Sequence, residues 1–213
     1  MNDVLQWIGT IANLVAACAV FFAIKQLTMQ RKAWADEHER SRREKAIELI
    51  SNFNDKFGKE WSATRRLVEK LTQEQLLKMD EGEPFDIDGK YGKFVVGALP
   101  GAFPSSAAPT YAINSEQSYQ LRFQALEILN ATEIICEAWE SDVANTRIVE
   151  RQLLFLYDPN AKEPTDLMHT YRRLMDDDDN FPSITNYIRV QKEKRKKREV
   201  GLPRVNESAE RGG

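Results

Sequence analysis

The sequence predicts a mostly α-helical protein: an N-terminal transmembrane helix continues into a stalk and carries a small cytoplasmic helical bundle with a Gly/Pro-rich loop insertion. Three observations support this fold class: an uncharged apolar run at residues 4–24, the absence of Gly and Pro from residues 25–57, and helical spacing of apolar residues through most of 58–190. A length of 213 residues is typical of one domain with appendages. The formal charge of -3 favours neither nucleic acid nor an acidic partner through long-range attraction.

The apolar run has the length and composition of a membrane span. Residues 4–24 contain no charged side chain. At about 1.5 Å per residue, a helix of this run is roughly 31 Å long, close to the hydrocarbon core of a bilayer at about 30 Å. We therefore expect the lipid bilayer as a partner, with Trp7, Phe21, Phe22 and Lys25 as membrane-anchor residues.

Flanking charge predicts the orientation of this span. Asp3 is the only charged side chain in residues 1–3, whereas basic residues are frequent after residue 24. The positive-inside rule then leaves residues 1–3 outside and places the C-terminal domain in the cytoplasm, at the inner (cytoplasmic) membrane. Residues 14–18 resemble a bacterial lipoprotein cleavage site ending in Cys18, which would place the rest outside the cytoplasm. We favour the uncleaved anchor because the apolar run continues past Cys18 and the basic residues follow it.

The stalk at residues 25–57 is charged nearly all round and then becomes amphipathic. Ala46, Ile50, Phe53 and Phe57 recur at spacings of four, three and four, which forms a narrow apolar seam of the coiled-coil kind. Self-association and docking on the chain's own helices would both bury this seam.

The domain at residues 58–190 shows several helical patterns. They cover residues 59–70, a short helix that begins at the Thr72 capping box, a long helix from Asn114 to about 141, and residues 143–157, 165–175 and 181 onward. The long helix should be the central core helix, with an inward stripe that Phe123 and Ile134 widen; the stripe is Leu121, Ala125, Ile128, Thr132, Ile135 and Trp139. Residues 82–114 interrupt this pattern with Gly and Pro. We expect a loop insertion there, either Ω-like or partly disordered, or a functional lid, with a short hairpin arm at residues 91–99 as an option.

No residue set predicts catalysis, and we expect a protein without enzymatic activity, cofactor or metal. The two histidines, His38 and His169, lie far apart, and Cys18 and Cys136 occupy apolar helical contexts. The four aspartates at 176–179 lack the alternate spacing of a calcium loop. Solvation, or contact with nearby basic residues, explains them better than a cation does.

A basic stretch near the C-terminus is the clearest candidate for contact with an anionic surface. Its members are Arg189, Lys192, Lys194, Arg195, Lys196, Lys197 and Arg198. A solvated tail, a lipid surface and nucleic acid all remain open, although no aromatic residue for base stacking follows Tyr187. Residues 191–213 are predicted to be a basic and then disordered tail.

The segment LEILNATEIICEAW, with the N-terminal anchor, AIELI before it and IVERQLLFLY after it, resembles uncharacterised bacterial and phage proteins. They are grouped as domain-of-unknown-function family 4760. The stretch that carries the resemblance is Leu129, Asn130, Glu133 and Ile134, and the Gly/Pro segment departs from it. The resemblance implies an anchored helical domain without catalytic residues, and its phage setting suggests defence or superinfection exclusion.

Together these features predict a membrane-anchored helical interaction protein that binds a protein partner or a second copy of itself. The alternative is a protein that binds nucleic acid or anionic lipid through the basic stretch, or an unrecognised enzyme.

Overall fold

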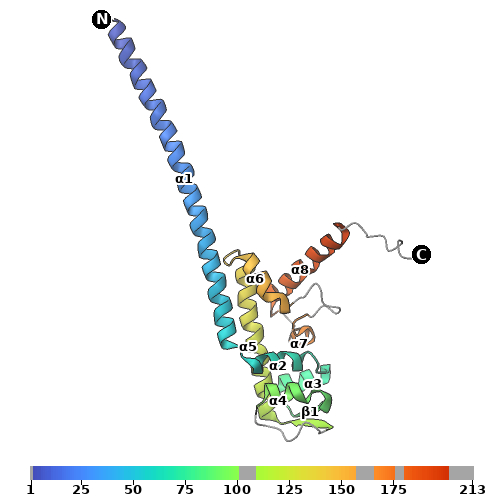
Figure 1. The fold of residues 1–213 in the computed structure, drawn as a ribbon. Helices are drawn as coiled ribbons and strands as arrows, with labels where there is room; N and C mark the ends of the chain where they lie inside the picture. Colours follow the sequence, from blue (N-terminus) through green and yellow to red (C-terminus); the bar gives the residue numbers. More distant parts are fainter. Residues whose placement is uncertain (1, 101–108, 157–165, 176–179, 202–213) are drawn as a thin grey trace, which may run out of the picture.

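The computed structural model describes residues 2–100, 109–156, 166–175 and 180–201, without the side chains of residues 2–18, 155, 195 and 198–201. Most of this chain is helical, which confirms the predicted class. Figure 1 shows one long helix rising from a head of shorter helices and a two-stranded sheet. The elements are α1 (Asn2–Lys56), α2 (Lys59–Val68), α3 (Gln73–Glu81), β1 (Phe85–Asp88), η1 (Gly89–Tyr91), α4 (Gly92–Ala98), β2 (Thr110–Ile113), α5 (Ser115–Glu140), α6 (Thr146–Gln152), η2 (Leu153–Phe155), α7 (His169–Leu174) and α8 (Pro182–Gly201).

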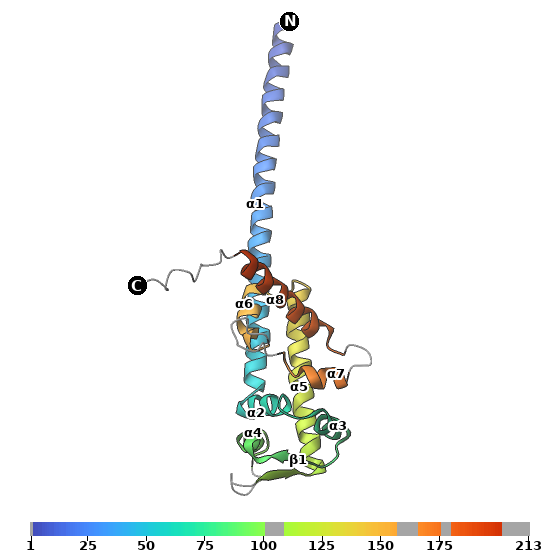
Figure 2. The ribbon, with the colours of Figure 1, turned by 90° about the vertical axis from the view of Figure 1, so that its right-hand side faces the viewer.

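Helix α1 joins the predicted span and stalk without a break. Both views show its N-terminal part extending well beyond the head (Figure 1, Figure 2). Within the part of the chain that the structure describes, no helix combines the length and apolar character needed to cross a membrane. The side chains of residues 2–18, which include Trp7 and most of the predicted span, lie outside that part.

The apolar seam of α1 packs against the chain's own head. Ala46 is completely buried in the core, and Phe53 and Phe57 are half-buried against it. Polar contacts hold the same part of α1: the backbone N–H of Asn145 donates to the Arg42 carbonyl at 3.0 Å. Three of the four predicted seam residues thus pack against the core of the head, and Ile50 is half-buried.

Helix α5 forms the centre of the head and lies beside the lower part of α1 (Figure 1, Figure 2). It contacts α1, α2, α3, α6 and α8. The six positions predicted to face inward are all buried, namely Leu121, Ala125, Ile128, Thr132, Ile135 and Trp139. Phe123 and Ile134, predicted to widen the apolar surface, are instead exposed, since no described element covers that side of the helix.

Local capping signals place the starts of two helices as predicted. The Gln75 N–H donates to Thr72 Oγ1 at 3.3 Å, and the Thr72 N–H donates to Gln75 Oε1 at 2.8 Å. Asn114 and Gln117 form the same reciprocal pair at the start of α5. Each pair satisfies two N–H groups that the first helical turn leaves without an intrahelical partner.

Residues 82–100 and 109–114 contain more regular structure than the predicted loop insertion. Strands β1 and β2 pair antiparallel, with Phe85 opposite Ile113, and their inward side chains are buried. The hairpin arm predicted at residues 91–99 is wrong, because this segment forms η1 and α4. Helix α4 packs on α2 and buries Val95 and Ala98, so tertiary contacts outweigh the low helix propensity of its glycines. Residues 101–108 lie outside the described part.

The helices predicted at 143–157 and 165–175 are shorter in the structure, as α6 with η2 and as α7. Helix α8 begins at Pro182 as predicted. Its first N–H groups bind a side chain from α5: Glu133 accepts from the Ser183 N–H at 2.7 Å and from the Ile184 N–H at 2.9 Å. This carboxylate fixes α8 to the central helix and compensates the positive end of the α8 dipole.

The first prediction concerns this cap. Glu133→Ala removes two charge-assisted hydrogen bonds, so we expect the free energy of unfolding to fall by about 1–3 kcal/mol. Glu137→Ala, an exposed site on the same helix, is the control and should change it by less than about 0.5 kcal/mol. Denaturant unfolding of the full chain in detergent, followed by circular dichroism, measures both variants. Equal effects would show that Glu133 does not cap α8.

A second prediction tests the contact between α4 and the sheet. A Cβ at Gly92 would lie 2.6 Å from Cε2 of Tyr111, a buried side chain of β2. Gly92→Ala should therefore destabilise the head by about 1–3 kcal/mol through overpacking. Gly58→Ala, where no atom lies within 4 Å, is the matched control. A Gly92→Ala chain as stable as wild type would refute the close packing.

Candidate functional site

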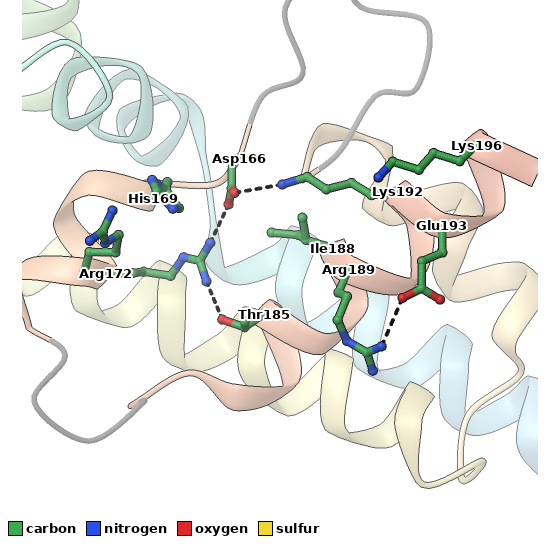
Figure 3. A pocket seen from close by; sticks show the side chains of 10 residues that line it. Asp166, His169, Arg172, Thr185, Ile188, Arg189, Lys192, Glu193 and Lys196 are labelled. Carbon is green, nitrogen blue, oxygen red and sulfur yellow. Dashed lines mark hydrogen bonds and ion pairs between the residues drawn. The ribbon is translucent and has the colours of Figure 1, made fainter. Parts of the chain in front are cut away.

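An open groove with a volume of ≈ 710 Å³ lies between α7 and α8 (Figure 3). The turn before α7 contributes Asp166, and charged side chains dominate the lining. The lining residues are Asp166, His169, Arg172, Arg173, Thr185, Ile188, Arg189, Lys192, Glu193 and Lys196.

Arg172 forms one wall of the groove and ties its two helices together. Its side chain is nearly buried; Nε donates to the Leu167 carbonyl at 2.9 Å and Nη1 to Thr185 Oγ1 at 3.0 Å. A third contact is the ion pair between Nη2 and Asp166. All three contacts are internal and the side chain is nearly buried, so Arg172 mainly shapes the groove.

Asp166 lies between two cations. Lys192 Nζ reaches it from α8 at 3.4 Å, opposite Arg172 (Figure 3). About one turn before Lys192 on α8, Arg189 Nη1 pairs with Glu193 at 3.1 Å, and both side chains are mostly exposed. The groove thus already contains carboxylates bound to some of its basic groups, in positions that an incoming anion could take.

The lining carries a clear excess of positive charge. Five basic side chains face two carboxylates, a difference of +3 with His169 neutral. His169, Arg173 and Lys196 are exposed, and their side chains form no hydrogen bond or ion pair with any residue that the structure describes. These three groups are available to a ligand without breaking an internal contact.

The structure divides the predicted basic stretch around the surface of α8. Arg189, Lys192 and Lys196 line the groove. Lys194 points to another side, where it pairs with Glu150 of α6 at 2.6 Å. Lys197 is exposed, and the side chains of Arg195 and Arg198 lie outside the described part.

Sequence reasoning missed the residues that α7 and its preceding turn add to the groove. Asp166, Arg172 and Arg173 lie 16 or more positions before Arg189, and no spacing rule connects a six-residue helix with the next helix. The only available signal was the adjacent pair Arg172 and Arg173.

The remaining candidate residues that the structure describes lie apart from the groove. Cys136 is buried, and burial together with nearby Glu133 raises the pKa of its thiol, which opposes formation of the reactive thiolate. Burial also raises the pKa of Tyr171, whose hydroxyl donates to Asp80 at 3.3 Å. His38 is exposed on α1, and the aspartates at 176–179 lie outside the described part. Among the described residues, no three His, Cys, Asp or Glu side chains cluster as metal ligands.

The other predicted anchor residues that can be placed lie on the free part of α1. Phe21, Phe22 and Lys25 are exposed, and the head covers none of them.

Comparison of the chain with protein-family models, with curated proteins and with solved structures finds no match. The resemblance noted for residues 129–134 therefore stays a prediction.

The third prediction concerns the buried thiol. In a Cys18→Ser background, Cys136 should react with a thiol reagent at pH 8 only as fast as the head unfolds, because its thiol is inaccessible and its raised pKa keeps it protonated. Adding denaturant should accelerate the reaction by orders of magnitude. Fast labelling of the folded chain would contradict the burial of this thiol.

Proposed function

We propose that this chain is a membrane-anchored interaction protein. In this proposal residues 4–24 of α1 lie in the bilayer, the stalk holds the head in the cytoplasm, and the head binds a partner. The observation that carries the proposal is the exposure of large apolar side chains on the part of α1 beyond the head: Val20, Phe21, Phe22 and Ile24 are 59%, 66%, 67% and 57% exposed.

Lipid is the covering that best suits these side chains. A soluble protein rarely leaves such a patch uncovered, and burying each of these side chains stabilises by about 1.5–3 kcal/mol. They continue an uncharged run that starts at residue 4, and Lys25 follows where the run meets the inner headgroups. The basic residues after Lys25 support the proposed orientation, with residues 1–3 outside.

Two surfaces of the chain could bind a partner: the apolar seam on α1 and the basic groove between α7 and α8. The head already covers the seam, so the groove is the better site for a partner. Self-association through polar positions of the span, Gln6, Thr10 and Asn13, is compatible with this arrangement. A role in phage defence or superinfection exclusion rests on the sequence resemblance alone.

A second candidate function is the binding of anionic lipid or nucleic acid through α8. The density of basic residues at positions 189–198 favours it, because such stretches attract polyanions. This second function does not depend on any feature of α1.

The fourth prediction tests the anchor. The full chain should stay in the membrane pellet after alkaline carbonate extraction. Leu14→Arg/Ala17→Arg should release it, because an arginine at the centre of a span costs about 2.5–3.5 kcal/mol. Gln26→Arg/Gln30→Arg, outside the proposed span, is the matched control and should remain in the pellet.

A reporter fused to the C-terminus gives the orientation in the same cells. We expect green fluorescence from a fluorescent protein and no activity from alkaline phosphatase. Extraction of the wild-type chain by carbonate, or activity of the phosphatase fusion alone, would refute the proposal.

A further inference from the structure

We propose that the groove between α7 and α8 is a binding site for a small soluble molecule that carries two or more linked phosphate groups. The volume of the groove, ≈ 710 Å³, lies within the range of small-molecule sites. Its positive excess of three charges matches the charge of a di- or triphosphate group. Guanidinium groups bind phosphate through paired N–H donors, and ammonium groups bind it as point charges.

The resting groove already holds carboxylates where phosphate oxygens would lie. Glu193 forms an ion pair with Arg189, and Asp166 forms one with Lys192. The Arg189–Glu193 pair is exposed to solvent, and pairs of that kind contribute about 0–1 kcal/mol. A phosphate chain can therefore displace Glu193 at small cost and also engage Arg173 and Lys196, which have no internal partner among the described residues.

Arg172 has a positioning role in this site. Its three internal contacts keep Asp166 and Thr185 together, and thus fix α7 against α8 at the separation that forms the groove. Ligand contact falls to the exposed basic groups of the lining, which are Arg173, Arg189, Lys192 and Lys196.

The lining argues against nucleic acid as the ligand. Among the described lining residues there is no Phe, Tyr or Trp, and Ile188 is the only one with an aliphatic side chain. Single-stranded nucleic acids gain much of their affinity from bases stacked on aromatic rings. A ligand recognised through phosphates alone needs no such platform.

The stalk argues against a lipid headgroup as the source of phosphate. The first residue of α1 with a described contact to the head is Glu39, which accepts from Asn145 Nδ2 at 2.8 Å. From Lys25 to Glu39 the helix rises about 21 Å at 1.5 Å per residue. Salt screens the attraction between charges beyond about 8 Å at physiological ionic strength. The head therefore begins farther from the proposed membrane surface than this attraction reaches. This choice of a soluble ligand rests on the proposed anchor.

The test uses the full chain in phosphatidylcholine nanodiscs and titrates inorganic tripolyphosphate by isothermal calorimetry. We expect saturable binding that weakens as salt increases. Arg173→Gln/Lys196→Gln should weaken it at least about tenfold. Lys59→Gln/Lys93→Gln removes the same charge from exposed sites outside the groove and should change it less than about twofold.

Glu193→Gln separates the proposal from a loss of folding. It removes a competing carboxylate from an exposed site, so binding should become about two- to fivefold tighter. A damaged head would not bind more tightly. Circular dichroism of each variant reports the fold independently.

Three results would overturn the proposal: no binding to the wild-type chain, equal loss in the groove and control variants, or no gain with Glu193→Gln. Replacing part of the phosphatidylcholine by phosphatidylglycerol tests the lipid source, and displacement of tripolyphosphate by that lipid would also overturn it. So would binding of a short single-stranded RNA through Arg173 and Lys196 that is tighter than binding of tripolyphosphate. Because binding is measured in nanodiscs, its failure is distinct from release by carbonate.

Discussion

Burial of the inward face of α5 is the interaction on which the rest of the head depends. This helix contacts α1, α2, α3, α6 and α8, so these elements are held together mainly because each covers part of one surface. Hydrophobic burial is not directional, and polar contacts supply the orientation. Glu133 gives α8 its starting point on α5, and Asn145 links the start of α6 to the backbone of α1.

Features encoded by neighbouring residues were predictable from the sequence. The capping boxes at Thr72 and Asn114, and the inward positions of α5, depend on spacings of three and four residues that a single helix fixes. The sheet and α4 were not predicted, because β1 and β2 are each four residues long and are stable only as a pair. Glycine-rich α4 forms because α2 covers it, and the local sequence does not reveal that contact.

The candidate site was only half predictable. Charge density in the sequence identified the side of the groove that α8 supplies, since Arg189, Lys192 and Lys196 belong to one basic stretch. The opposing side depends on Arg172, whose contacts with Asp166 and Thr185 connect segments that no periodic pattern relates. Sequence reasoning also treated the stretch as one surface, whereas the helical turn directs Lys194 away to Glu150.

The continuity of α1 has a mechanical consequence. A single helix without Gly or Pro between residues 25 and 57 behaves as a stiff lever, and its lower end is fixed within the head. A helix in a bilayer adjusts to local thickness by tilting. In the proposed arrangement, a thinner or thicker membrane would swing the head sideways as one unit, so the position of the groove would report the state of the bilayer around the anchor.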